Sequence, residues 1–141
     1  MIIMSVDYGD VRTGIAVCDK FEMLASPVCV ITERDEEKLI EQISDLAKKY
    51  KVERLAVGLP KNMDSSIGER GEKCILFAEK LEKYTSIPTV TVDERLTTVI
   101  AHNALSSTNV RGKKRKDTVD KVAAVLILQS YLDSRKNGLN Q

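Results

Sequence analysis

The sequence predicts an α/β protein with a mixed sheet and helices on both faces. Two observations lead to this class. Short apolar runs joined by polar or glycine-bearing turns form three strands within the first 31 residues. From residue 35 onward, segments of helical periodicity alternate with short apolar runs, which favours parallel strands covered by helices. The expected order of elements is β-β-β-α-β-α-β-α-α.

The opening strands are expected at about 2–8, 13–19 and 23–31. The first strand ends in Asp7, and Gly9, Arg12 and Gly14 follow it directly. An acid delivered into a glycine-bearing turn can simply form that turn, or it can hold a metal ion or a phosphate. Pro27 lies inside the third run and favours an edge strand or a β-bulge.

Two amphipathic helices come next. The first begins at Asp35, and a second is expected at 67–84, where Ser66 and Glu69 fit a capping box. A short buried strand at 55–57 lies between them. The apolar residues at helical spacing are Leu39, Ile40, Ile43, Leu46, Ala47 and Tyr50 in the first helix, and Cys74, Phe77, Ala78 and Leu81 in the second.

The C-terminal part begins with a β-branched strand, 89–92, that ends in Asp93 and Glu94. A third helix is expected from Thr97 or Thr98. A basic loop follows, and a final helix is expected at about 118–135. The basic residues of that loop are Arg111, Lys113, Lys114, Arg115 and Lys116.

Length and composition indicate a single domain that spans residues 1–141, with 43% hydrophobic and 30% charged residues. The three cysteines are widely spaced and contain no C-x-x-C pair, so we expect neither a disulfide framework nor a structural zinc site. This cysteine usage fits a reducing cytoplasm. The N-terminal apolar run is too short for a membrane span, and no membrane partner is expected.

Acidic residues are expected at three places beside the sheet. Asp7 and the Asp93–Glu94 pair end strands, and Asp120 is placed in the first turn of the final helix. Asp120 shares a helical face with the apolar residues Ala124, Ile127, Leu128 and Tyr131. Asp120 could instead only complement the helix dipole, but a dipole role does not require a position on the buried stripe.

Converging acids repel one another, and a divalent cation relieves that repulsion. Oxygen ligands without a cysteine or histidine cluster select Mg²⁺ or Mn²⁺ over zinc. His102 is the only histidine and lies within a predicted helix, so a Ser-His-Asp or Cys-His mechanism has little support.

Two segments are candidates for contact with nucleic acid. The loop from Gly58 to Arg70 follows a strand end, and Lys61, Asn62 and Arg70 are suitable phosphate or sugar donors, although the loop could be an ordinary capped one. The basic loop is the second segment, because Lys/Arg runs of this kind are typical of nucleic-acid patches.

Five motifs in order resemble the YqgF/RuvX family of ribonuclease H-like proteins, described as Holliday junction resolvases and as pre-16S ribosomal RNA processing nucleases. The motifs are D-Y-G-D-V-R-T-G-I-A at 7–16, V-G-L-P-K-N-M-D at 57–64, V-D-E-R-L-T-T at 92–98, K-K-R-K at 113–116 and D-K-V-A-A-V-L-I-L-Q-S-Y-L-D at 120–133. The resemblance covers nearly the whole chain and implies a five-stranded mixed sheet whose first three strands are antiparallel.

The resemblance implies metal ligands at Asp7, at one of the Asp93–Glu94 pair, and at Asp120. Successive strand residues point to opposite faces, so at most one of the pair should face the metals, and we favour Glu94. Arg12 and Arg95 join the candidate nucleic-acid contacts. Asp10 departs from the neutral or basic residue expected in that turn and adds a negative charge beside the proposed metal site.

The leading hypothesis is a metal-dependent phosphodiester hydrolase that processes the 5′ end of pre-16S ribosomal RNA. A resolvase of branched DNA and a non-catalytic RNA-binding ribosome-assembly factor are the alternatives, and a ribosomal particle is a candidate partner. An actin-like kinase would need two such domains to enclose its nucleotide. The sequence does not decide whether the substrate is RNA or DNA. It also does not decide between a monomer and a homodimer, since a symmetric junction would call for a dimer.

Overall fold

The computed structural model describes residues 1–62, 64, 66–93 and 112–136, and these contain a five-stranded sheet in the order β3-β2-β1-β4-β5. The strands are β1 (Ile3–Asp7), β2 (Arg12–Cys18), β3 (Ala25–Thr32), β4 (Arg54–Leu59) and β5 (Thr89–Asp93). The first three are antiparallel neighbours, whereas β4 runs parallel to β1 and β5 runs parallel to β4. The predicted mixed sheet is therefore confirmed.

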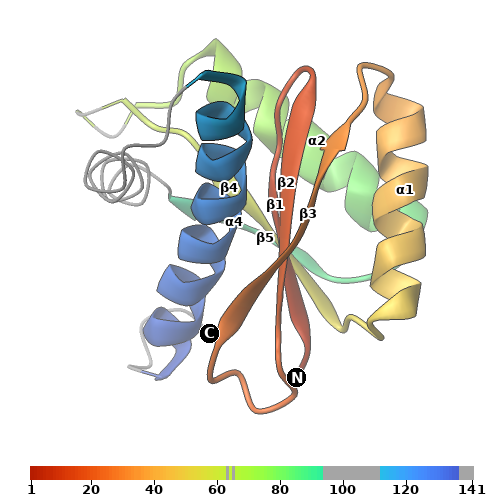
Figure 1. Cartoon of the computed structure of the whole chain (residues 1–141). Coiled ribbons are helices and arrows are strands. Elements are labelled where there is room, and N and C mark those ends of the chain that lie inside the picture. Colours follow the sequence, from red (N-terminus) through yellow and green to blue (C-terminus); the bar gives the residue numbers. More distant parts are fainter. Residues whose placement is uncertain (63, 65, 94–111, 137–141) are drawn as a thin grey trace.

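Helices cover both faces of this sheet (Figure 1). The helices α1 (Glu36–Lys49) and α2 (Glu69–Thr85) pack on one side, here named the α1/α2 face, and α4 (Gly112–Lys136) packs on the other, the α4 face. Each face has its own apolar core. Phe77 and Leu81 of α2 are fully buried on the first face, and Ile127 and Leu128 of α4 are fully buried on the second.

Strand β1 is central, and it is buried on both faces. Met4 and Val6 belong to the core under α1 and α2, whereas Ile3 belongs to the core under α4. The buried Ser5 hydroxyl donates a hydrogen bond of 2.6 Å to the carbonyl of Ala124 in α4. Because side chains alternate along a strand, Asp7 comes out on the α4 face, like Ile3 and Ser5.

Strand β3 lies at the edge of the sheet, as the proline in it predicted. Ile15 of β2 pairs with Cys29, but the next residue, Ala16, pairs with Pro27. Val28 is therefore an extra residue in β3, and the register shifts there. Both expectations for Pro27, an edge position and a bulge, are confirmed.

The two helices on the α1/α2 face begin in different ways. Asp35 caps α1, and its side chain accepts a hydrogen bond from the amide of Lys38 at 3.2 Å. Helix α2 begins at Glu69 with Gly68 as its N-cap and without a side-chain cap, so the predicted Ser66–Glu69 capping box is wrong. The Ser66 hydroxyl instead donates to Asp64 at 2.5 Å, which closes the loop locally.

Helix α4 begins six residues earlier than predicted, at Gly112. The basic residues 113–116 therefore lie in its first turns and not in a loop, and Asp120 lies in the third turn and not in the first. Lysine and arginine are good helix formers, so nothing in this run stops the helix. The predicted apolar stripe of Ala124, Ile127, Leu128 and Tyr131 is buried as expected. The expected third helix, with His102, falls outside the described residues.

The three cysteines form no disulfide, as predicted. Cys18 and Cys74 are buried and Cys29 is partly buried. None of the helices in the described part of the chain is long and apolar enough to cross a membrane.

Replacing Ser5 with alanine should lower the free energy of unfolding by about 1 kcal/mol, because the change removes a buried hydrogen bond between β1 and α4. Urea unfolding measures this loss. Ser26→Ala on the edge strand is the matched control, since Ser26 is exposed and should change stability by less than about 0.5 kcal/mol. Equal stability of the two variants would contradict the role given to Ser5.

Candidate active site

The carboxyl ends of β1, β4 and β5 meet at one edge of the sheet. In a parallel sheet, ligand crevices lie beyond such ends. The β1–β2 turn, the loop after β4 and the start of α4 gather at this edge, at the top of Figure 1, far from the N-terminus. Asp7, the last residue of β1, is therefore located where the sequence predicted a site.

Asp7 is flanked by glycine on both neighbouring strands. It pairs with Gly14 of β2, and because Val6 pairs with Val57, the next residue of β4 beside Asp7 is Gly58. Neither flanking strand places a side chain next to the carboxylate on this face. Glycine within a strand often marks a place where a ligand approaches closely. The surroundings of Asp7 on the sheet therefore suit a bound ion or phosphate.

Helix α4 runs antiparallel to β1 and brings position 120 toward this edge. Arg54, which pairs with Ile3, donates to the Tyr131 hydroxyl at 2.9 Å, and Ser5 bonds to Ala124. Asp7 lies two residues beyond Ser5, about 6.6 Å along the strand. Asp120 lies one turn before Ala124, about 6 Å along the helix. The backbones at Asp7 and Asp120 are therefore at about the same level.

The alternation of side chains along β5 also decides on which face of the sheet Asp93 lies. Val90 and Val92 pack in the core of the α4 face, so alternation along β5 places Asp93 on the α1/α2 face. Asp93 is exposed there, on the face opposite to Asp7. This position disfavours Asp93 as a co-ligand of Asp7. Glu94 and Arg95 themselves lie outside the described residues.

The donors at this edge match a hard divalent cation in type. Carboxylate oxygens without a neighbouring thiol or imidazole suit Mg²⁺ or Mn²⁺. Among the described residues, no group of three or more His, Cys, Asp or Glu side chains could hold a metal ion. The described residues therefore do not by themselves form a complete ligand set around Asp7.

The turn that follows Asp7 is built tightly around Gly9. Its amide donates to the Thr13 hydroxyl at 3.3 Å, and that hydroxyl is 3.4 Å from the Gly9 carbonyl, to which it donates. A Cβ atom at position 9 would lie 2.0 Å from the carbonyl oxygen of Arg12. Only glycine fits here without a movement of the backbone. Arg12 begins β2 directly after this turn and is partly buried.

Tyr8 anchors the turn to the α1/α2 face. Its ring stacks on Phe77 of α2 with a centroid distance of 4.0 Å and an interplanar angle of 4°. Its hydroxyl donates to Glu36 of α1 at 3.0 Å. Burial, together with this carboxylate, raises the pKa of Tyr8 to about 12. The sequence prediction missed Tyr8, and the available signal was an aromatic residue directly after the strand-ending acid.

Arg70 and Lys73 of α2 hold the next part of the turn. Asp10 accepts from Arg70 Nη1 at 2.8 Å and from Lys73 Nζ at 3.4 Å. Arg70 Nη2 also donates to the carbonyl of Tyr8, and its guanidinium lies 4.9 Å from the centre of the Tyr8 ring. The bond from Arg70 is the main reason that the pKa of Asp10 is lowered. The extra negative charge noted in the sequence is therefore matched by two cations.

Lys61 and Asn62 lie in the loop after β4, as predicted. The Asn62 amide donates to the Ser66 carbonyl, and its side chain donates to the Ser66 hydroxyl, both at 2.9 Å. A Cβ at Gly71 would lie 2.8 Å from the Pro60 carbonyl oxygen, so glycine lets α2 approach the end of β4 closely. The loop and the β1–β2 turn thus lie beside one another, linked by Arg70.

A family model described as "RuvX: Holliday junction resolvase" matches residues 1–134. The chain belongs to this family. Relatives from Caldanaerobacter subterraneus subsp. tengcongensis and Halothermothrix orenii are 44% and 47% identical to it. The first alignment covers 97% of this chain and 99% of the relative, and the second covers 94% and 95%. Both relatives carry the name "Putative pre-16S rRNA nuclease".

The chain shares its fold with solved structures of Holliday junction resolvases. RuvC of T. thermophilus, in complex with a Holliday junction substrate, has a TM-score of 0.61 at 11% identity and covers 97% of this chain and 96% of its own. The fowlpox virus Holliday junction resolvase has a TM-score of 0.57 at 13% identity, with 95% and 99% covered. The ribonuclease H-like fold expected from the motifs is confirmed.

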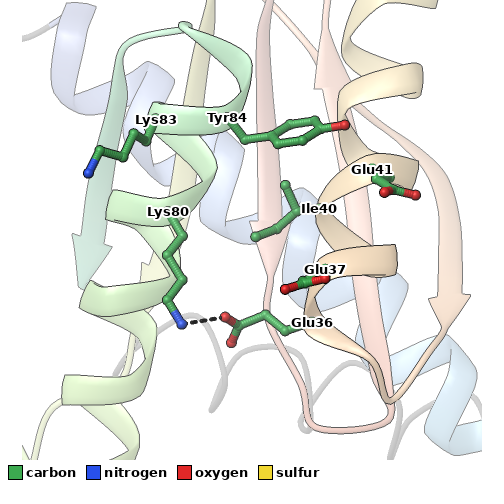
Figure 2. A pocket seen from close by; sticks show the side chains of 7 residues that line it. All are labelled: Glu36, Glu37, Ile40, Glu41, Lys80, Lys83 and Tyr84. Atoms are coloured by element: carbon green, nitrogen blue, oxygen red, sulfur yellow. Dashed lines mark hydrogen bonds and ion pairs between the residues drawn. The ribbon is translucent and has the colours of Figure 1, made fainter.

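A pocket of about 480 Å³ lies away from Asp7, between α1 and α2 (Figure 2). Acidic side chains of α1 form one wall, and Lys80, Lys83 and Tyr84 of α2 form the other. Glu36 joins this pocket to the β1–β2 turn, because it accepts from both Lys80 at 2.8 Å and Tyr8. The pocket is on the α1/α2 face, so it is separate from the candidate active site.

Gly9→Ala should lower the free energy of unfolding by about 1–3 kcal/mol, since the new methyl group forces the turn to move. The displaced turn should also reduce any turnover that depends on Asp7. Thermal melting and a cleavage assay measure the two effects.

Gly68→Ser is the matched control for this change. A Cβ at position 68 would lie 3.7 Å from Nδ2 of Asn62, and serine is a good N-cap residue. This variant should keep its stability or gain slightly. A Gly9→Ala protein that melts like the control would refute the tight packing of the turn.

Proposed function

We propose that this protein is a divalent-metal-dependent endonuclease that hydrolyses a phosphodiester bond of structured nucleic acid, acting at the 5′ end of pre-16S ribosomal RNA. One observation carries the chemistry. Asp7 ends the central strand on the α4 face, between two glycines, with position 120 of α4 at the same level. The names of relatives more than 40% identical over nearly the whole chain support the substrate.

In this proposal Asp7, Glu94 and Asp120 hold the metal ions. When bound, two Mg²⁺ or Mn²⁺ ions would supply an activated water and stabilise the leaving oxygen. The contribution of the chain is to keep three carboxylates together that would otherwise repel one another. Burial of β1 on both faces and the Ser5–Ala124 bond hold the strand and the helix in the required register.

Basic residues of the chain would hold the nucleic-acid backbone. The first turns of α4 carry Lys113, Lys114, Arg115 and Lys116 ahead of Asp120 on the same helix. Further contacts are proposed for Arg12, Lys61, Asn62, Arg70 and Arg95. Such contacts read the shape of a folded RNA and carry little sequence information.

A second candidate function is the resolution of branched DNA. The family description favours it, and so does the fold shared with resolvases. The fold alone does not choose a substrate, so the relatives with much higher identity make RNA the first choice. A non-catalytic RNA-binding assembly factor is the third candidate. Work on precursor ribosomal RNA would place the protein in the cytoplasm, with a ribosomal particle as partner, as a monomer or a homodimer.

A direct cleavage assay separates these candidates. A precursor 16S RNA fragment and a four-way DNA junction are offered side by side, with Mg²⁺ or Mn²⁺. Metal-dependent cuts in the RNA support the proposed function, and symmetric cuts in the junction support the resolvase. Binding of the RNA without any cleavage would support the non-catalytic assembly factor.

Asp7→Asn should reduce cleavage by at least about 100-fold, because it removes the charge of a metal ligand while its size is kept. The metal-free melting temperature should stay the same or rise slightly, since repulsion among acids falls. Asp45→Asn, an exposed change on α1, controls for the loss of one charge. Turnover near that of the control would remove Asp7 from the mechanism.

Changing Lys113, Lys114, Arg115 and Lys116 to glutamine should weaken RNA binding about equally for all sequences. The slope of log affinity against log salt should shrink by roughly 0.7–0.9 for each lost phosphate contact. Fluorescence anisotropy at several salt concentrations measures both values. The control changes four exposed lysines of α1 and its end, Lys38, Lys48, Lys49 and Lys51. An equal effect of the two sets would reduce the basic run to a general charge effect.

A further inference from the structure

Two cations of α2 converge on a single carboxylate oxygen at the edge of the sheet that carries Asp7. Arg70 Nη1 and Lys73 Nζ lie 2.8 Å and 3.4 Å from the same atom, Oδ1 of Asp10. Asp10 is only three residues after Asp7. The carboxylate is 67% exposed, so it reaches this pair of cations from the solvent side of the turn.

Arg70 is held in place without the help of Asp10. Its other terminal nitrogen donates to the carbonyl of Tyr8, and its guanidinium lies over the Tyr8 ring. Tyr8 is itself fixed by Phe77 and Glu36. The guanidinium would therefore keep its position if the carboxylate moved away, and Lys73, one turn further along α2, would remain beside it.

The contact with Asp10 is of a kind that is easily exchanged. Ion pairs this exposed contribute little to stability, because water competes for both partners. A phosphodiester group presents oxygens of the same charge, and arginine binds phosphate with well-matched donors. Asp10 lies in a turn whose neighbouring residue is Gly9, so its side chain can leave without disturbing the core.

We propose that Arg70 and Lys73 form a subsite for a backbone phosphate of the nucleic acid, and that the carboxylate of Asp10 occupies this subsite until the substrate displaces it. This inference rests on the proposed function for its ligand class. Asp10 would weaken binding at this point and make it more dependent on a correctly placed phosphate.

The test compares the affinity of wild-type protein and Asp10→Asn for a labelled precursor 16S RNA fragment, by anisotropy without metal. Removing the competing charge should tighten binding about three- to tenfold at low salt. Asp45→Asn makes the same change in net charge at the far edge of the sheet, beside β3, and should leave the affinity nearly unchanged. Lys73→Gln should remove most of the gain when it is combined with Asp10→Asn.

Three results would overturn the subsite. They are a lower melting temperature of Asp10→Asn without tighter binding, an equal gain in Asp45→Asn, and an undiminished gain in the double variant. The first result would mean that Asp10 has only a structural role, in which it links the β1–β2 turn to α2.

The test of the phosphate subsite can be distinguished from the test of the proposed nuclease activity. Tighter binding by Asp10→Asn to an RNA that the wild type never cleaves would support the subsite and overturn the nuclease. Cleavage that depends on Asp7, with no gain in Asp10→Asn, would do the reverse. If neither the wild type nor Asp10→Asn binds the RNA, both the subsite and the nuclease are overturned.

Discussion

The burial of β1 on both faces is the constraint on which the rest of the structure depends. A strand covered by helices on each side must send alternate residues into two different cores, and here Met4 and Val6 enter one while Ile3 and Ser5 enter the other. This alternation decides the face on which Asp7 comes out. The buried bond from Ser5 to the Ala124 carbonyl then sets the register of α4, and with it the level of Asp120.

The α1/α2 face of the sheet holds the turn that follows Asp7. Tyr8 follows Asp7 and packs against Phe77, so this end of the strand is anchored on the α1/α2 face. Arg70 connects this ring to Asp10 and ties the β1–β2 turn to the start of α2. The result is an acid on one face whose position depends on aromatic packing and ion pairs on the other.

Sequence reasoning was accurate where the hydrophobic period is strong and less so where polar residues set the boundaries. The apolar stripe of α2 and the edge position of Pro27 follow directly from spacing and residue type. The basic run was mistaken for a loop because its residues are charged, although lysine and arginine also favour helix. Ser66 matched a capping box but bonds to Asp64 instead, because a nearby acceptor competes with the helix amides.

The sequence by itself determined the class of the sheet, the order of its strands along the chain and the presence of Asp7 at a strand end, because these depend on periodicity and on local turn chemistry. Only the tertiary structure decided on which face of the sheet Asp7 and Asp93 each lie. Asp93 ends a strand as Asp7 does, yet the register of β5 sends it to the other side of the sheet. The contact of Asp10 with Arg70 and Lys73 also joins residues 60 and more positions apart, and such pairings arise only when α2 packs beside the β1–β2 turn.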